Sequence, residues 1–532
     1  MDPQIEVLDT TLRDGAQAQG VTFSLQDKIS LVERLDDLGV KYIEGGWPSS
    51  NLKDMKFFKA VKQISLKNSK IVACSTTYKR GSSPSKDKGL NALLKVDLDT
   101  AVIIGKSWDL HVKEILKAEL DENITMIQES IEYLRSHGIR VIFDAEHFYD
   151  GYSANREYSL RVIKAAEESG AEVIVLCDTN GGTTISRFNE ITRDALAKLN
   201  TKAGVHCHND LGLAVANTLV AIELGVKHIQ GTINGFGERC GNADLCQLIP
   251  TIQLKMGISA LKSTKPLSEQ LRSLTALSRY VYELTNMTPD PYKPYVGINA
   301  FAHKAGIHID AILKNPRAYE HIDPSLVGNK RRIAISELSG RSAIVNEALK
   351  LGIKLDKESE MVDKILNEIK RLEAQGYYLE NANATVHLII LKAMGYDLQP
   401  FTLKFWRVTT EKFEQTFATS EVLVNVKRES IHEAAVGVGP VHALDRALRK
   451  ALLKRFPILR KTQLINYKVS VVESGGTASS VRVFIEFKDD NYNWATTALS
   501  RNILEASIKA LVDGYTYRLA LEKLKVNGIN TN

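Results

Sequence analysis

The sequence predicts an α/β fold: a TIM (β/α)8 barrel, followed by a helical linker region and a C-terminal α+β domain. Three observations lead to this prediction. The chain has 532 residues, which is too long for a single hydrophobic core. Short runs rich in Val and Ile alternate with stretches of helical spacing through the first half. This alternation stops near residue 260, and strand-like runs return only after about residue 400.

Eight apolar runs predict the strands of the barrel. They lie at 5–11, 41–47, 70–76, 100–107, 140–148, 172–179, 202–208 and 228–237. Near-continuous apolar runs that alternate with helices are typical of parallel strands buried on both faces. Eight is also the number of strands that closes such a barrel. An open doubly wound sheet is the alternative. We favour the barrel because polar residues follow nearly every strand, and a barrel gathers those ends around one mouth.

The segment between the first two strands shows how the helices are predicted. Its apolar residues recur at helical spacing at Ile29, Leu31, Val32, Leu35 and Leu38. Ser24, with Asp27 three residues later, has the pattern of a capping box, and Gly39 is a typical helix end.

The second half of the chain divides into two further parts. A Pro-rich connector at 286–297 precedes a segment that is irregular and largely helical. Strand-like runs such as "EVLVNVKR" and "SVRVFIEFK" then alternate with helical runs at 440–454 and 500–513. This mixture predicts a separate α+β domain. The predicted boundaries are 1–265 for the barrel, 266–398 for the linker and 399–532 for the last domain.

Composition limits the classes of partner. The net charge is +6, from 69 basic and 63 acidic residues, and no dense Lys/Arg block predicts nucleic-acid binding. The N-terminus lacks the basic and apolar regions of a signal peptide, and no apolar stretch approaches the length of a membrane span. Five scattered cysteines show no CxxC pair, as in a protein with reduced thiols. We therefore expect a cytoplasmic protein without nucleic-acid or membrane partners.

Polar residues at three strand ends form the candidate site. His206 and His208 end the seventh strand on one face, Arg13 and Asp14 follow the first, and Asn242 lies in a glycine-rich loop after the eighth. Taken singly, these are polar residues at a strand tip, a solvated ion pair and a turn. Together, Asp14, His206, His208 and Asn242 are a ligand set suited to Mg, Mn or Zn. Two positions of an octahedral ion would stay open for a 2-oxo acid.

The same segments carry a family resemblance. "LRDGAQ" followed by Lys28, together with "GVHCHNDLGLAVAN", resembles two signatures of the isopropylmalate, homocitrate and citramalate synthases of the DRE-TIM metallolyase superfamily. "FAHKAGIHIDAI" resembles their linker motif. "GVGPVHALDRALRKAL" and "RNILEASIKALVDG" resemble their C-terminal regulatory and dimerisation domain. "YIEGGWPSSNLKD", "GKSWDLHV" and "FDAEHFYDGY" are closest to the citramalate synthase branch. Ser49 and Val438 depart from the usual glycine and asparagine.

The resemblance implies an acyltransferase that converts acyl groups to alkyl groups on transfer. Its reaction would be a Claisen-type condensation of acetyl-CoA with pyruvate, then thioester hydrolysis to (R)-citramalate and CoA, in isoleucine biosynthesis. 2-Isopropylmalate synthase, in leucine biosynthesis, and homocitrate synthase are the alternatives. A carbon–carbon lyase of the same superfamily is a different class, against which the C-terminal domain argues. A non-catalytic amino-acid sensor is a third. The resemblance also implies a homodimer with isoleucine as its effector.

The resemblance assigns roles to three residues at the barrel mouth. Arg13 would bind the substrate and stabilise the oxyanion that develops on the keto oxygen; its alternative role is a plain ion pair. Glu44 would hold Arg13 or a metal ligand in place. Thr179 would donate to the carboxylate of the keto acid, or simply form a turn. Alternation along an extended strand turns His147 and Asn209 away, so both are left out of the predicted site.

A proton-transfer unit is also implied. Glu146, at the end of the fifth strand, would pair with His308 of the linker near acetyl-CoA, and a carboxylate partner makes an imidazole more basic. His303 is the competing histidine. If His308 comes from the partner subunit, activity would need a dimer.

Overall fold

The computed structural model describes residues 4–50, 52–263, 265–412, 416–472 and 476–526. The chain divides into two compact units, Met1–Phe301 with Ile322–Lys330, and Ala302–His321 with Arg331–Asn532. Each unit has its own hydrophobic core. Among the described residues, no helix combines the length and the apolar character needed to span a bilayer.

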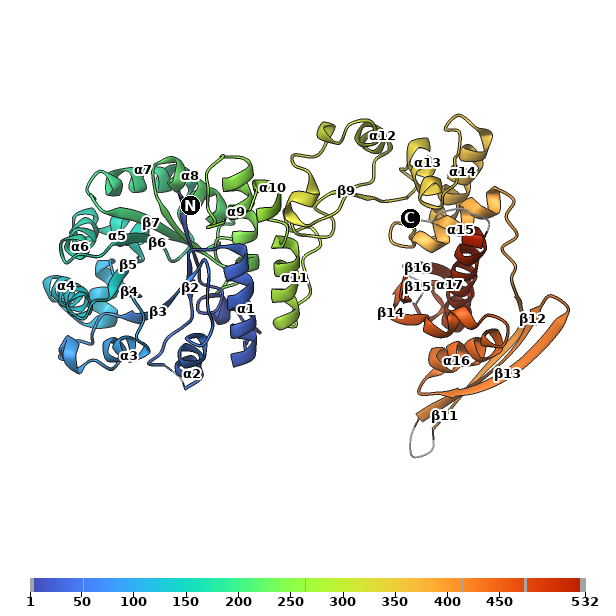
Figure 1. Cartoon of the computed structure of the whole chain (residues 1–532), viewed down its shortest axis with the longest axis horizontal. Coiled ribbons are helices and arrows are strands. Elements are labelled where there is room, and N and C mark those ends of the chain that lie inside the picture. The colour runs from blue at the N-terminus through green and yellow to red at the C-terminus, as the bar shows by residue number, and fades with distance from the viewer. Residues whose placement is uncertain (1–3, 51, 264, 413–415, 473–475, 527–532) are drawn as a thin grey trace. The chain divides into compact units, whose positions relative to one another are not determined.

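The first unit is built on a closed parallel barrel, which confirms the predicted fold class (Figure 1). Each strand pairs with the next, and β1 pairs with β8, where Glu6 to Asp9 lie opposite His228 to Gly231. Within the described residues the barrel strands are β1 Glu6–Asp9, β2 Tyr42–Glu44, β3 Lys70–Thr76, β4 Thr100–Lys106, β5 Arg140–Glu146, β6 Val173–Asp178, β7 Lys202–Cys207 and β8 His228–Gly231.

Helices follow the strands and surround the barrel in Figure 1. They are α1 Leu25–Leu38, α2 Leu52–Val61, α3 Lys88–Val96, α4 Leu120–Ser136, α5 Phe148–Ala154, α6 Arg156–Glu168, α7 Ile185–Leu196, α8 Ala214–Glu223, α9 Leu245–Leu254, α10 Leu267–Gln270 and α11 Leu274–Leu284. The predicted capping box is present at α1, where Ser24 and Asp27 bond each other's backbone N–H groups. Gly39 ends α1 at φ 96°, a conformation that favours glycine.

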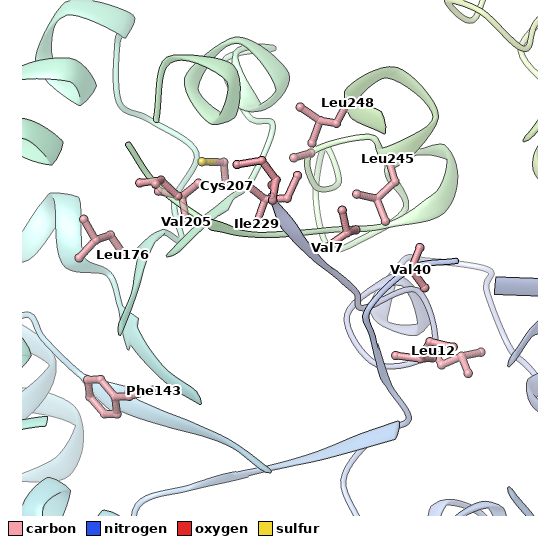
Figure 2. Packing of buried hydrophobic residues seen from close by; sticks show 14 of the residues in the cluster. Val7, Leu12, Val40, Phe143, Leu176, Val205, Cys207, Ile229, Leu245 and Leu248 are labelled. Atoms are coloured by element: carbon pink, nitrogen blue, oxygen red, sulfur yellow. The ribbon is translucent and has the colours of Figure 1, made fainter. Parts of the chain in front are cut away.

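Alternation along the strands separates two apolar layers. On β1, Val7 belongs to the outer layer between strands and helices, and Leu8 belongs to the inner layer that fills the barrel. The inner layer consists of Leu8, Tyr42, Val72, Cys74, Val102, Ile142, Val173, Val175 and Cys177. Figure 2 shows part of the outer layer, with Val205 and Ile229 from two strands and Leu248 from α9. Because both faces of each strand are buried, the strands read as continuous apolar runs.

The second unit begins with short strands and helices. These are β9 Ala302–His303, α12 Gly306–Lys314, β10 Arg332–Ile333, α13 Arg341–Lys350, α14 Glu360–Ala374 and α15 Asn383–Ala393. Two three-stranded antiparallel sheets follow, each with a helix on one face. They comprise β11 Thr402–Lys412, β12 Thr416–Val426, β13 Glu429–Gly437 with α16 Pro440–Leu453, and β14 Gln463–Val471, β15 Val481–Lys488, β16 Asn493–Ser500 with α17 Ile503–Val526.

The α+β character of the C-terminal part is thereby confirmed. The predicted boundaries at residues 265 and 398 stay predictions, because the two units divide within the predicted linker and each includes part of it.

Candidate functional site

A tight turn after β1 sets the position of Arg13 and Asp14. The backbone N–H groups of Arg13, Asp14 and Gly15 all donate to the carbonyl oxygen of Thr10. Asp9, one residue earlier, accepts from the N–H and hydroxyl of Thr11. These bonds turn the chain back at the carboxyl end of the strand, where barrel enzymes place their sites.

The structure brings Asp14, His206 and His208 together, as the sequence predicts. Asp14 Oδ2 lies 3.1 Å from His206 Nε2 and 3.7 Å from His208 Nε2. All three side chains are buried, and their ligand atoms lie within 4.8 Å of one another. Adjacent ligands of an octahedral ion with bonds of about 2.1 Å lie about 3 Å apart. This group therefore fits a divalent cation.

Asn242 also lies beside this group. It forms an antiparallel bridge with His208, and its Nδ2 donates to the carbonyl oxygen of Phe236 at 3.1 Å. This bond leaves Asn242 Oδ1 buried, with no hydrogen-bond partner among the described residues. A buried oxygen without a hydrogen-bond partner costs free energy of folding, and a metal ion would remove this cost. Asn242 Oδ1 is therefore suited to be the fourth ligand, as predicted from the sequence.

The charges around the group favour a cation. Burial raises the pKa of Asp14, but the charge of Arg13 and the hydrogen bond with His206 outweigh it and hold this pKa well below its usual range. Burial, with the nearby His206, lowers the pKa of His208 to about 3. His208 is therefore neutral at pH 7 and keeps a lone pair for a metal.

Arg13 is fixed between two carboxylates. Its Nε donates to Glu44 Oε2 at 2.8 Å, and its Nη1 lies 3.4 Å from Asp14 Oδ2. Thr10 donates to the same Glu44 oxygen. Burial lowers the pKa of Arg13, but the charges of Glu44 and Asp14 outweigh it and raise this pKa further. Arg13 is therefore a permanently charged donor, and Glu44 is one of its two carboxylate contacts.

Lys28, part of the first family signature, ties α1 to the loop after β2. Its Nζ donates to Asp54 at 2.7 Å and to the carbonyl oxygen of Gly45 at 2.8 Å. Asp54 in turn accepts from the backbone N–H of Trp47. A cavity of about 220 Å³ next to this loop is lined by Arg13, Lys28 and Trp47, among others.

Thr179 directly follows β6 and bonds two other residues near the mouth of the barrel. Its hydroxyl oxygen accepts from the backbone N–H of His147 at 2.8 Å, and Arg239 donates to its carbonyl oxygen at 2.6 Å. His147 has φ 58°, so the alternation that would turn it away ends at Glu146. Its ring centroid lies 4.2 Å from that of His111. Asn209, the other residue left out, accepts from the backbone N–H of Ala214, the first residue of α8.

Glu146 ends β5 and forms an ion pair with Lys106 at the end of β4. Lys106 was not singled out from the sequence, although a lysine that ends an apolar strand run was a usable signal. Glu146 and His308 belong to different units, so their pairing stays a prediction.

The two candidate histidines of the linker have different surroundings within the second unit. His303 Nε2 lies 3.3 Å from Glu320 Oε1, and Glu320 also accepts from Arg331. His308 is exposed and stacks on Tyr319, with centroids 4.1 Å apart. His303 is thus already paired with a carboxylate inside its own unit.

Two residues that contact the site were missed from the sequence. Gln230 accepts at Oε1 from His206 Nδ1 at 2.9 Å, and its Nε2 donates to Asp144 at 2.8 Å. Both residues lie inside strands that we interpreted as apolar runs. A polar residue in a buried strand is the signal that was available.

Three family models match the chain in succession. A model described as HMGL-like matches residues 4–276. A homocitrate synthase post-HMGL domain-like model matches residues 295–377, and the LeuA allosteric (dimerisation) domain matches residues 380–519.

Curated relatives match nearly the whole chain. The (R)-citramalate synthase of Sulfolobus acidocaldarius is 50% identical over 98% of this chain and 98% of its own length. The (R)-citramalate synthase of Aquifex aeolicus is 46% identical over 98% of both. The chain belongs to the citramalate synthase family. A 2-isopropylmalate synthase of Methanocaldococcus jannaschii is only 32% identical, over 97% of this chain and 95% of its own length. The chain is therefore an acyl-CoA condensing transferase, as citramalate synthases are.

Proposed function

We propose that the chain condenses acetyl-CoA with pyruvate and hydrolyses the thioester, which gives (R)-citramalate and CoA. The observation that supports this most strongly is the identity of 50% over 98% of the chain to an (R)-citramalate synthase. The convergence of Arg13 with the buried Asp14, His206 and His208 supports the same chemistry.

The metal site consists of Asp14, His206, His208 and Asn242 in this proposal. A bound Mg, Mn or Zn ion would act as a Lewis acid on the keto oxygen of pyruvate and orient the keto acid. The protein's contribution is a set of buried ligands whose protonation states suit a cation. His208 stays neutral, and Asp14 stays ionised.

Arg13 supplies a fixed positive charge near the keto oxygen. Its two carboxylate contacts use Nε and Nη1, so part of the guanidinium is left to face substrate. A donor that is held before the reaction need not reorganise as charge develops. Glu44 acts through Arg13, by holding its position.

Proton transfer is assigned to Glu146 and His308. Glu146 already forms an ion pair with Lys106. An ionised carboxylate would hold the imidazole of His308 in one tautomer, ready to take a proton from the methyl group of acetyl-CoA. The hydroxyl hydrogen of Thr179 is available to the pyruvate carboxylate, because the Thr179 oxygen acts as acceptor toward His147.

The C-terminal part would provide dimerisation and feedback control. It matches the LeuA allosteric (dimerisation) domain over residues 380–519. A cavity of about 1220 Å³ lies in the second unit among α14, α15, β11 and α17, lined among others by Leu388, Trp406 and Asp513. We propose a homodimer whose activity responds to isoleucine.

The test is a panel of 2-oxo acids with acetyl-CoA, in which the free thiol of CoA is measured. We expect kcat/KM for pyruvate to exceed that for 2-oxoisovalerate and 2-oxoglutarate by at least about tenfold, and EDTA to abolish thiol release. Preference for 2-oxoisovalerate would instead indicate 2-isopropylmalate synthase activity. Turnover that resists EDTA would contradict the metal site. Cleavage of a hydroxyacyl-CoA without condensation would indicate a lyase.

A further inference from the structure

Three buried residues form a hydrogen-bonded row across the interior of the barrel. His206 of β7, Gln230 of β8 and Asp144 of β5 are 5%, 1% and 3% exposed. Pairing of β7 with β8 places His206 directly opposite Gln230. β5 pairs with β4 and β6, so the contact between Gln230 and Asp144 spans the barrel rather than two neighbouring strands.

The row determines which nitrogen of His206 carries hydrogen. Asp144 Oδ1 accepts from Gln230 Nε2 at 2.8 Å, and a carboxylate can only accept. While Asp144 is ionised, the amide nitrogen of Gln230 must therefore face it, and the amide oxygen faces His206 Nδ1 at 2.9 Å. An amide oxygen also only accepts, so His206 Nδ1 is the donor. In the neutral imidazole that binds a metal, the lone pair is therefore on Nε2, the nitrogen that faces Asp14.

That orientation requires a cation next to His206. Nε2 lies 3.1 Å from Asp14 Oδ2, and two lone pairs at this distance repel each other unless a metal ion or a proton lies between them. A reversed amide would place an N–H group against His206 Nδ1, make Nδ1 the acceptor and put hydrogen on Nε2. His206 could then no longer bind the metal shared with Asp14.

Asp144 keeps an acceptor toward the amide in either of its protonation states. Burial, partly offset by the charge of His206, raises the pKa of Asp144 to about 7. A protonated carboxyl group still has a carbonyl oxygen that can accept from Gln230 Nε2.

We propose that Asp144 and Gln230 are positioning residues that hold His206 in the tautomer able to bind the metal. The proposal rests on the metal site of the proposed function and extends it to two residues that do not touch the metal. In many metal sites a carboxylate contacts the ligating histidine directly. Here the amide of Gln230 lies between Asp144 and His206, so Asp144 orients the amide and the amide orients the histidine.

The experiment measures the Kd for Mn²⁺ of the full-length protein, from the EPR signal of free Mn²⁺. Gln230→Leu removes the acceptor, and we expect about 10- to 100-fold weaker binding. Asp144→Leu frees the amide to rotate and should weaken binding as well. The double variant Asp144→Asn, Gln230→Glu should stay within about threefold of wild type. In this variant the amide N–H at position 144 donates to one oxygen of the carboxylate at position 230. The other oxygen of that carboxylate still accepts from His206 Nδ1.

Gln253→Leu is the matched control. Gln253 is a buried glutamine of α9 that bonds Gln270 instead of a histidine, so its replacement should leave the Kd for Mn²⁺ unchanged. Thermal unfolding of the metal-free variants shows whether each one is folded. If Gln230→Leu does not fold, the Kd of the double variant for Mn²⁺, compared with those of wild type and Asp144→Leu, tests the positioning role.

The outcomes separate the two proposals. A wild-type protein that binds no Mn²⁺ would overturn the metal site, and the positioning role with it. Wild-type affinity in folded Gln230→Leu would overturn only the positioning role. A folded double variant that binds as weakly as Asp144→Leu would also overturn it, because the restored acceptor would then have no effect.

Discussion

At the scale of single residues, the two charged side chains that follow β1 make different contacts and therefore have different roles. Arg13 and Asp14 are adjacent in sequence and both buried, yet Arg13 uses its Nε for Glu44, whereas Asp14 faces the two histidines. A guanidinium can bond a carboxylate and still present further N–H groups. An ammonium group has no such fixed planar array.

We therefore predict that Arg13→Lys lowers kcat by about 10²- to 10³-fold, as loss of an oxyanion donor does. Binding of Mn²⁺ should change little, because Arg13 is not a ligand. Steady-state CoA release and Mn²⁺ affinity measure the two effects. A fall in Mn²⁺ affinity as large as the fall in kcat would contradict the assigned role.

The two linker histidines can be separated by paired substitutions. His308→Ala should lower kcat by about 10²- to 10⁴-fold, the range of a general base. His303→Ala breaks a contact with Glu320 inside the second unit and should act mainly on stability. The checks are kcat and thermal unfolding of each variant. The opposite pattern would assign the base to His303.

How much of the site could be predicted depends on where each residue lies. Asp14, His206 and His208 lie at or just after the carboxyl ends of strands, and the barrel itself requires such ends to meet, so their convergence followed from the sequence. Gln230 and Asp144 lie within strands, where one sequence does not show which layer of the barrel a side chain enters. The sequence also does not show that His147 has a left-handed φ of 58°, which ends the alternation used to leave it out of the site.

At the scale of elements, strands were easier to predict than the ends of helices. Burial on both faces makes each barrel strand an apolar run. The predicted helix at 500–513 instead continues as α17 to Val526. Gly514 is a typical helix end, but the ring of Phe487 packs against it and leaves no space for a side chain. Contacts beyond it extend the helix, including a 2.7 Å hydrogen bond between Tyr517 and His387.

Asp513 on the same helix gives a prediction about stability. It lines the large cavity of the second unit, and burial raises its pKa to about 7, from about 3.9 in an unfolded chain. The stability that this shift represents is fully present below about pH 4 and is lost as the pH rises through 7.

Asp513→Asn removes this charge, so we predict that it stabilises the protein at pH 8, by on the order of 4 kcal/mol, and has little effect at pH 4. Thermal unfolding at both pH values measures the difference. Equal changes in stability at the two pH values would show that burial of the charge is not the cause.

At the scale of the whole molecule, the second unit joins linker helices to the C-terminal domain. His387 of α15 bonds Tyr517 of α17 and, at 3.0 Å, Glu347 of α13. All three side chains are buried. This network connects α13, in the region matched by the homocitrate synthase post-HMGL domain-like model, to α15 and α17 of the LeuA-like region.

Regulation is predicted for the intact chain. Isoleucine should inhibit CoA release in a saturable manner, and leucine at the same concentration should have little effect, because the chain matches citramalate synthases more closely than 2-isopropylmalate synthases. Titration of both amino acids at a fixed pyruvate concentration is the measurement. Insensitivity to both would remove the proposed effector.

The two units are not separated at one position in the sequence, because the chain leaves the first unit and returns to it. This limits where chimeric proteins can be joined. Residues 322–330 return to the first unit, where Val327 joins the apolar core and Asn329 donates to the carbonyl oxygens of Tyr295 and Gly297. A chimera that joins this barrel to another protein after residue 301 would lose those contacts. The natural crossover point lies after residue 330, so each new barrel must bring residues 302–321 with it.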